Sequence, residues 1–283
     1  MIMTQIYVNF LYFLLRFWSL FPLSFLYIVL GNFLTFFLFV FGYRKKVIDE
    51  NLKLIFPDWD RKKILKTRKK YYRRLAELIV EIIKMTDFSL QELRNRIHVK
   101  NPELLKNAVN KNQKIVFLTA HYVNWEWMIV IPITFGMKTY AVYQPLENAV
   151  WDRVLRKIRG KFGAEPIAIS QVARMFLSGN KQEKSTAYCI LIDQSPGKDH
   201  PYYTHFLEQE VPFYHGIEKM IQKFNWTCFY PRYRIVKKGY LELEILELNP
   251  EHLIEQYKTN LEQDIYNFPE FWLLSHRRFK HKK

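Results

Sequence analysis

The stretch KIVFLTAHYVNWEWMIVIPITFG, residues 114–136, decides the fold class. Residues 114–120 form a short apolar run that is typical of a buried strand. Residues 124–136 have helical spacing, and Asn124 is a natural N-cap for that helix. His121 lies between the two elements. A buried strand followed directly by a helix is the repeating unit of a parallel sheet.

The same alternation continues on the carboxyl side of this stretch. Further strands are expected at 138–144, 165–169 and 189–193, and further helices at 148–163, 171–179 and 216–225. Residues 228–236 and 240–248 are two long alternating segments joined through Gly239, which predicts an antiparallel hairpin. On the amino side, residues 61–85 have the period of a long helix. The expected fold class is therefore α/β, with a largely parallel central sheet and helices on both faces.

The N-terminal segment has a different character. Residues 17–43 carry no charge, and this run exceeds the length of about 20 apolar residues that cross a membrane. Basic residues follow at once at 44–46, and the positive-inside rule places such a cluster in the cytoplasm. We therefore expect an N-terminal transmembrane helix in a membrane anchor at 1–43, and one cytoplasmic domain at 44–283.

Other interpretations of the N-terminal segment stay open. Its apolar run also fits a pair of helices packed on the domain. Residues 2–15 are apolar too, and they fit either an interfacial helix or a second membrane segment. A cleaved signal peptide is disfavoured, because the first fifteen residues carry no positive charge and no small-residue cleavage site follows.

Composition narrows the classes of function. The chain has 43 Lys and Arg against 27 Asp and Glu, and 17% of its residues are aromatic. The aromatic content excludes a disordered chain. Two cysteines, Cys189 and Cys228, lie in apolar runs and are expected to be buried and reduced. A basic domain attracts acidic proteins and anionic membranes, and we expect no nucleic-acid partner because no nucleic-acid-binding module is present in the sequence.

His121 is the strongest candidate for catalysis. It follows a core strand, and the sites of parallel sheets lie beyond the carboxyl ends of strands. Glu126 lies in the first turn of the next helix, where the helix dipole favours a carboxylate. If the loop folds back, Glu126 accepts a hydrogen bond from one imidazole nitrogen and leaves the other free to take a proton from a bound hydroxyl. On spacing alone, a purely structural histidine remains the alternative.

No other catalytic pattern competes with this pair. The sequence contains no G-x-S-x-G motif, no P-loop and no G-x-G-x-x-G motif. Its eight histidines have no zinc-ligand spacing with the cysteines. We therefore expect neither a metal nor a bound cofactor.

The segment HYVNWEW, residues 121–127, resembles the H-x4-D/E motif of the glycerolipid acyltransferase superfamily. Within it, the string is most similar to the bacterial lipid A late acyltransferases of the lauroyl/myristoyl type. Other blocks of that family are resembled in the same order by residues 42–58, 143–167, 190–197, 211–220 and 268–280. The resemblance covers nearly the whole chain, and it implies the fold of the glycerolipid acyltransferases.

The resemblance also implies a reaction. A fatty acyl chain would move from acyl carrier protein to a hydroxyl of a lipid A precursor at the inner membrane. His121 would be the general base, and Glu126 would orient and stabilise it. Arg159 would meet the developing oxyanion or a phosphate of the donor. Asp193 and Gln194 would line or buttress the site, although Asp193 could equally cap a buried turn.

Three further expectations concern the substrates. Asn124 is expected to be one of the substrate-binding residues. Gln144 stands where many relatives have Arg, which puts recognition of an anionic glycolipid in doubt. A related acyltransferase for an aminolipid, a phosphoglycolipid or a lysophospholipid is therefore an alternative, with Gln144 and the loop 197–211 as places where acceptor choice would differ. Acyl-coenzyme A is an alternative donor, and a non-catalytic basic membrane protein is the least favoured hypothesis.

Overall fold

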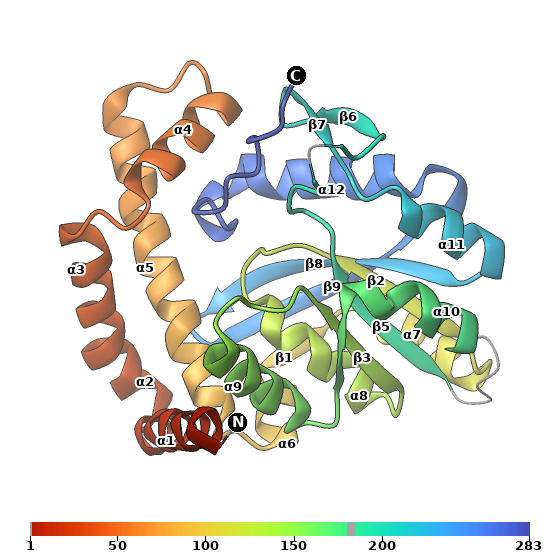
Figure 1. Cartoon of the computed structure of the whole chain (residues 1–283), viewed down its shortest axis with the longest axis horizontal. Helices are drawn as coiled ribbons and strands as arrows, with labels where there is room; N and C mark the ends of the chain where they lie inside the picture. Colours follow the sequence, from red (N-terminus) through yellow and green to blue (C-terminus); the bar gives the residue numbers. More distant parts are fainter. Residues whose placement is uncertain (1, 180–184, 198) are drawn as a thin grey trace.

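The computed structural model describes residues 2–179, 185–197 and 199–283, and it shows a central sheet with helices on both faces (Figure 1). Seven strands form the main sheet in the order β1-β9-β8-β2-β5-β3-β4. Their bounds are β1 (Ile97–Val99), β2 (Lys114–Thr119), β3 (Lys138–Tyr143), β4 (Glu165–Ala168), β5 (Thr186–Leu191), β8 (Thr227–Lys237) and β9 (Tyr240–Leu248). Every neighbouring pair is parallel except β8 with β9. The predicted fold class is confirmed.

Alternate residues of β2 face the two halves of the core. Ile115 and Phe117 pack into one hydrophobic cluster, and Val116 and Leu118 pack into the other. The first cluster is covered by α6 (Leu90–Arg94), α7 (Glu103–Asn110), α8 (Val130–Thr134) and α9 (Ala149–Gly160). The second is covered by α10 (Val172–Gly179), α11 (Gly216–Phe224) and α12 (Leu253–Asn267). All six residues of β2 are buried for this reason.

Most predicted elements form close to their expected bounds. The helix predicted at 61–85 is α5 (Arg61–Met85), and the carboxylate of Asp60 caps its N-terminus by accepting from the Lys63 amide. The helix predicted at 124–136 begins instead as a 3₁₀ turn, Trp125–Ile129, and continues as α8. The sequence did not predict β1, α12 or the small antiparallel hairpin of β6 (Tyr203–Phe206) and β7 (Gln209–Pro212). Residue 198 of the loop 197–211 lies outside the described residues.

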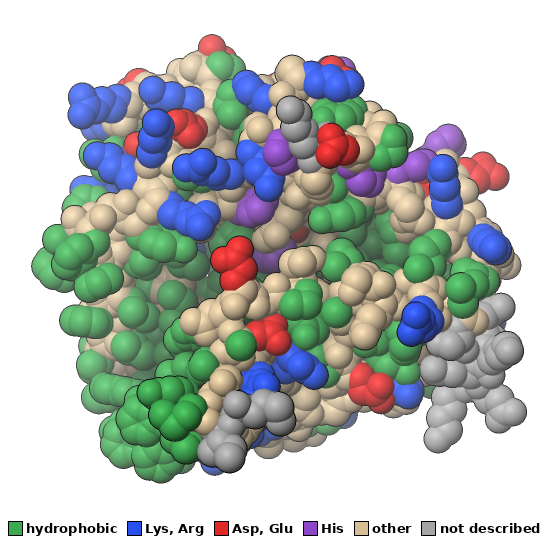
Figure 2. All heavy atoms as spheres, viewed as in Figure 1, with side chains coloured by type: hydrophobic (Ala, Val, Ile, Leu, Met, Phe, Trp, Pro, Cys, Tyr) green, Lys and Arg blue, Asp and Glu red, His purple; other side chains and the backbone are tan. Residues whose placement is uncertain are grey.

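The uncharged N-terminal run is divided at Pro22. The first helix, α1 (Ile2–Ser19), takes up the whole of 2–15 and packs against α5 and α9. After Pro22 come α2 (Leu23–Leu26), a π-helical turn (Tyr27–Gly31) and α3 (Asn32–Val40). Leu23–Val40 together are long and apolar enough to cross a membrane, and most of this span is exposed. Figure 2 shows the hydrophobic side chains of these helices massed on one part of the surface.

Candidate active site

His121 lies just beyond the carboxyl end of β2, and Asp193 lies just beyond that of the neighbouring strand β5. The two strands are parallel, and Thr119 is paired with Leu191. Residues two positions past this pair therefore leave the sheet side by side. His121 Nδ1 lies 2.8 Å from Asp193 Oδ1, and the Gln194 side-chain nitrogen lies 3.2 Å from His121 Nε2.

Asp193 is buried and accepts two further hydrogen bonds. Its Oδ2 accepts from the His121 backbone amide at 3.1 Å and from the Trp272 indole at 2.9 Å. Burial alone would raise the pKa of Asp193, but its electrostatic interaction with His121 and the hydrogen bonds from the N–H donors outweigh burial and hold the pKa below its usual value. An ionised Asp193 can only accept a hydrogen bond, so a neutral His121 ring carries its proton on Nδ1 and none on Nε2. This is the protonation state of a general base.

The predicted hydrogen bond between Glu126 and His121 is wrong. Both oxygens of Glu126 accept from Arg159, at 2.7 Å from Nε and 2.6 Å from Nη2. The carboxylate that is hydrogen-bonded to the imidazole, at Nδ1, belongs to Asp193 and not to Glu126. Burial would raise the pKa of Glu126, but the charge and hydrogen bonds of Arg159 lower it, and the nearby charge of His121 lowers it further. Among the described residues, Glu126 thus interacts with His121 electrostatically and forms its hydrogen bonds with Arg159.

Arg159, which was expected to meet the oxyanion or a phosphate of the donor, forms an ion pair with Glu126 in the structure. Its guanidinium lies on α9, is mostly buried, and uses two of its three nitrogens on Glu126. The guanidinium also lies 5.6 Å from the centre of the Tyr143 ring. Both side chains line the cavity in front of His121.

Asn124 is confirmed as the cap of the following helical turn. Its side-chain oxygen accepts from the Trp127 amide at 3.3 Å, and its side-chain nitrogen donates to Glu81 of α5 at 2.6 Å. The other oxygen of Glu81 accepts from the hydroxyl of Tyr27 in the N-terminal span. Asn124 is 1% exposed and does not line the catalytic pocket, so its predicted place among substrate-binding residues is corrected to a supporting one.

The loop around His121 is strained and held from several sides. Val123 has a φ of +54°, which a β-branched residue rarely adopts and which persists only where neighbours enforce it. The Val123 amide donates to the carbonyl of Phe271 at 3.0 Å, and the Leu273 amide donates to the carbonyl of His121 at 2.9 Å. The C-terminal segment thus fixes the catalytic loop and also supplies Trp272 to Asp193. Sequence spacing gave no signal for these contacts, because 79 positions separate Trp272 from Asp193.

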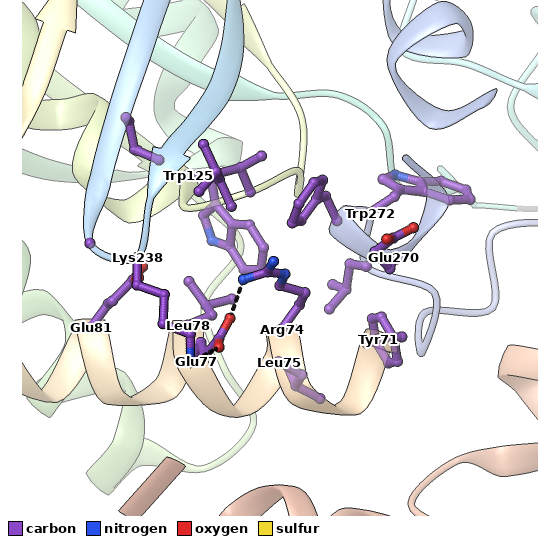
Figure 3. Close-up of a pocket in the computed structure, with 16 residues that line it drawn as sticks. Tyr71, Arg74, Leu75, Glu77, Leu78, Glu81, Trp125, Lys238, Glu270 and Trp272 are labelled. Atoms are coloured by element: carbon purple, nitrogen blue, oxygen red, sulfur yellow. Dashed lines mark hydrogen bonds and ion pairs between the residues drawn. The ribbon is translucent and has the colours of Figure 1, made fainter. Parts of the chain in front are cut away.

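Two cavities meet at Trp125. The catalytic pocket measures about 1700 Å³ including the space open to solvent, and His121, Glu126, Gln144, Arg159 and Gln194 line it together with Trp125. A second pocket of about 540 Å³ lies between α5 and the turn of the β8–β9 hairpin. Figure 3 shows it with Leu75, Leu78 and the Arg74–Glu77 ion pair on α5, and Lys238 on the hairpin. Trp125 lines both cavities and lies against the ring of His121, with the ring centres 5.0 Å apart.

Comparisons with known proteins identify the family of this chain. The family model described as bacterial lipid A biosynthesis acyltransferase matches residues 1–281. A lipid A biosynthesis acyltransferase of Haemophilus influenzae is 23% identical over 233 residues, which cover 79% of this chain and 72% of that protein. The family match includes the whole loop from His121 to Trp127 and also Asp193. The chain therefore belongs to the bacterial lipid A biosynthesis acyltransferase family and is an acyltransferase.

Proposed function

We propose that this enzyme transfers a fatty acyl chain from the thioester of acyl carrier protein to a hydroxyl of a lipid A precursor, with His121 as the general base. The observation that carries the proposal is the bond from Nδ1 of His121 to a buried, ionised Asp193, which leaves Nε2 facing the pocket. Among the residues that the structure describes, no Ser, Thr or Cys side chain is hydrogen-bonded to Nε2 of His121, whose neighbour is Gln194, so the hydroxyl of the acceptor acts as the nucleophile in this scheme.

The proposed reaction proceeds through one tetrahedral intermediate. Nε2 of His121 takes the proton of the acceptor hydroxyl as its oxygen attacks the thioester carbon. The new C–O bond forms, and the carbonyl oxygen becomes an oxyanion. The intermediate collapses to the ester as the C–S bond breaks, and the departing thiolate takes the proton back from His121.

The other polar residues of the pocket have separate roles in this scheme. Asp193 is a positioning residue that fixes the tautomer of His121 and stabilises the imidazolium. Glu126, held by Arg159, adds a second negative charge near the ring. The side-chain amide of Gln194 lies next to Nε2 of His121, where the acceptor hydroxyl would bind. The N–H of Gln194 would also donate a hydrogen bond to the oxyanion.

We further propose that Leu23–Val40 anchors the enzyme in the inner membrane with the catalytic domain on the cytoplasmic side. The exposed apolar surface of α1 to α3 supports this placement. Figure 2 shows Lys and Arg side chains next to that surface, over α4 (Lys45–Ile55) and the adjoining part of α5. Basic side chains next to a membrane-facing surface attract anionic lipid headgroups and an acidic donor protein.

The test is label transfer in membranes that contain the full chain. Acyl carrier protein charged with a labelled fatty acid is added with a lipid A precursor, and the labelled lipid is identified. We expect label on the precursor, and a loss of at least about a thousandfold for His121→Ala with unchanged membrane retention. Label on an aminolipid or a lysophospholipid instead would contradict the acceptor, and parent-rate transfer by the variant would contradict the mechanism.

A further inference from the structure

A basic groove lies between the end of the N-terminal span and the C-terminal segment. It measures about 1490 Å³ including the space open to solvent. Five cationic side chains line it, and Glu147 is the single acid: the cations are Arg44, Lys45, Lys46, Arg277 and Lys280. The groove therefore has a net charge of +4, five cations less one carboxylate.

Most of these cations lack a compensating acid. Lys46 has a distant carboxylate partner in Glu50, at 3.9 Å. In the part of the chain that the structure describes, no carboxylate lies within 4.0 Å of the other four. Arg44 adopts a left-handed backbone, and its guanidinium donates to the carbonyl of Ser275 at 3.0 Å, which ties the end of the span to the C-terminal segment. Unpaired cations held together in one groove favour a phosphate, which charge-assisted hydrogen bonds bind strongly.

The groove is continuous with the catalytic pocket. Glu147, His276 and Lys280 line both. Burial lowers the pKa of His276 to about 4, so this ring is neutral at pH 7. Its Nε2 is buried and has no hydrogen-bond partner among the residues that the structure describes. The His276 side chain therefore lies at the junction of the two cavities without adding a charge to either.

We propose that this groove binds the phosphate of the acceptor lipid headgroup while a hydroxyl of the same headgroup reaches His121, an inference that rests on the proposed function. The groove begins at Gly42, two residues after α3 ends at Val40. This is the level at which a membrane lipid presents its headgroup. The basic surface in Figure 2 borders the hydrophobic surface at the same place.

The test compares one acceptor with and without its phosphate. Lys45→Ala/Arg277→Ala removes two groove charges that do not line the catalytic pocket, and Lys219→Ala/Lys223→Ala on α11 is the matched control with the same change in net charge. For the phosphorylated acceptor we expect KM to rise about tenfold or more in the groove variant, with kcat within about threefold of the parent. For the dephosphorylated acceptor, KM of parent and groove variant should agree within about twofold. The control should match the parent with both acceptors.

Other outcomes assign the groove elsewhere. An equal rise in KM for both acceptors, or a rise only in KM for acyl carrier protein, would overturn the proposal. Absence of transfer by the parent would instead remove the proposed function. If the groove variant transfers no label, binding of the folded protein to phosphatidylcholine vesicles that contain either acceptor is measured by flotation instead. The parent should prefer vesicles with the phosphorylated acceptor, and an equal preference in the variant would contradict the site.

Discussion

Two carboxyl groups contact the loop that carries His121, and they come from different regions. Asp193 follows the carboxyl end of β5, and Glu81 lies on α5. Burial would raise the pKa of both carboxyl groups. For Asp193 the electrostatic interaction with His121 and the hydrogen bonds from N–H donors outweigh burial, and the pKa falls below its usual value. Glu81 has only neutral donors, Tyr27 and Asn124, and its pKa rises to about 7. The partners of a buried carboxyl group therefore decide whether it works as a charge or as a structural link.

The largest effect is expected at Asp193. Asp193→Asn keeps the shape of the side chain but removes the charge that fixes the imidazole tautomer. We expect kcat to fall by about 10³- to 10⁴-fold, with the KM of the acceptor changed by less than about threefold. Steady-state transfer rates measure this, and circular dichroism confirms the fold. A variant that keeps more than about a tenth of the parent rate would remove Asp193 from the mechanism.

A smaller effect is expected at Glu126. Glu126→Gln removes a charge near His121 but no hydrogen bond to the ring, so we expect kcat to fall by about 10- to 100-fold. The change also leaves the buried Arg159 without its carboxylate. The double variant Glu126→Gln/Arg159→Gln separates the two causes. Recovery of the melting temperature without recovery of kcat would show that the charge of Glu126 itself contributes to transfer, and recovery of both would contradict that role.

The smallest effect is expected at Glu81, and it concerns stability. The pKa of Glu81 is about 7 in the folded protein against an ordinary value of 4.5, so the folded state holds the proton more tightly. The resulting penalty is absent below pH 4.5, grows as the pH rises towards 7, and is complete above it. Glu81→Gln removes this titration. The melting temperature of the parent relative to the variant should therefore fall between pH 4.5 and 7.

The matched control for this prediction is the exposed Glu251→Gln. Its melting temperature should follow that of the parent across the same pH range. A parent that gains stability relative to Glu81→Gln as the pH rises would contradict the raised pKa of Glu81.

Periodicity in the sequence was sufficient to place β2, α5 and the β8–β9 hairpin, because each has one regular pattern of buried residues. The position of His121 at the end of a predicted strand marked it as a candidate, and Asp193 was named through the family resemblance. Periodicity could not pair them, since their contact depends on the register of β2 with β5, which no local pattern encodes. Glu126 was preferred as the partner of His121 because it is close in sequence. Its actual partner, Arg159, comes from another helix, and their contact is a tertiary one.

The most direct test of the central claim is the protonation of the His121 ring, measured by nitrogen NMR on the detergent-solubilised full chain. The signal of His121 is assigned among the eight histidines by its loss in His121→Ala. We predict a proton on Nδ1 and none on Nε2 in both the parent and Glu126→Gln, and a different tautomer or a mixture in Asp193→Asn. A tautomer that changes in Glu126→Gln but not in Asp193→Asn would contradict the account.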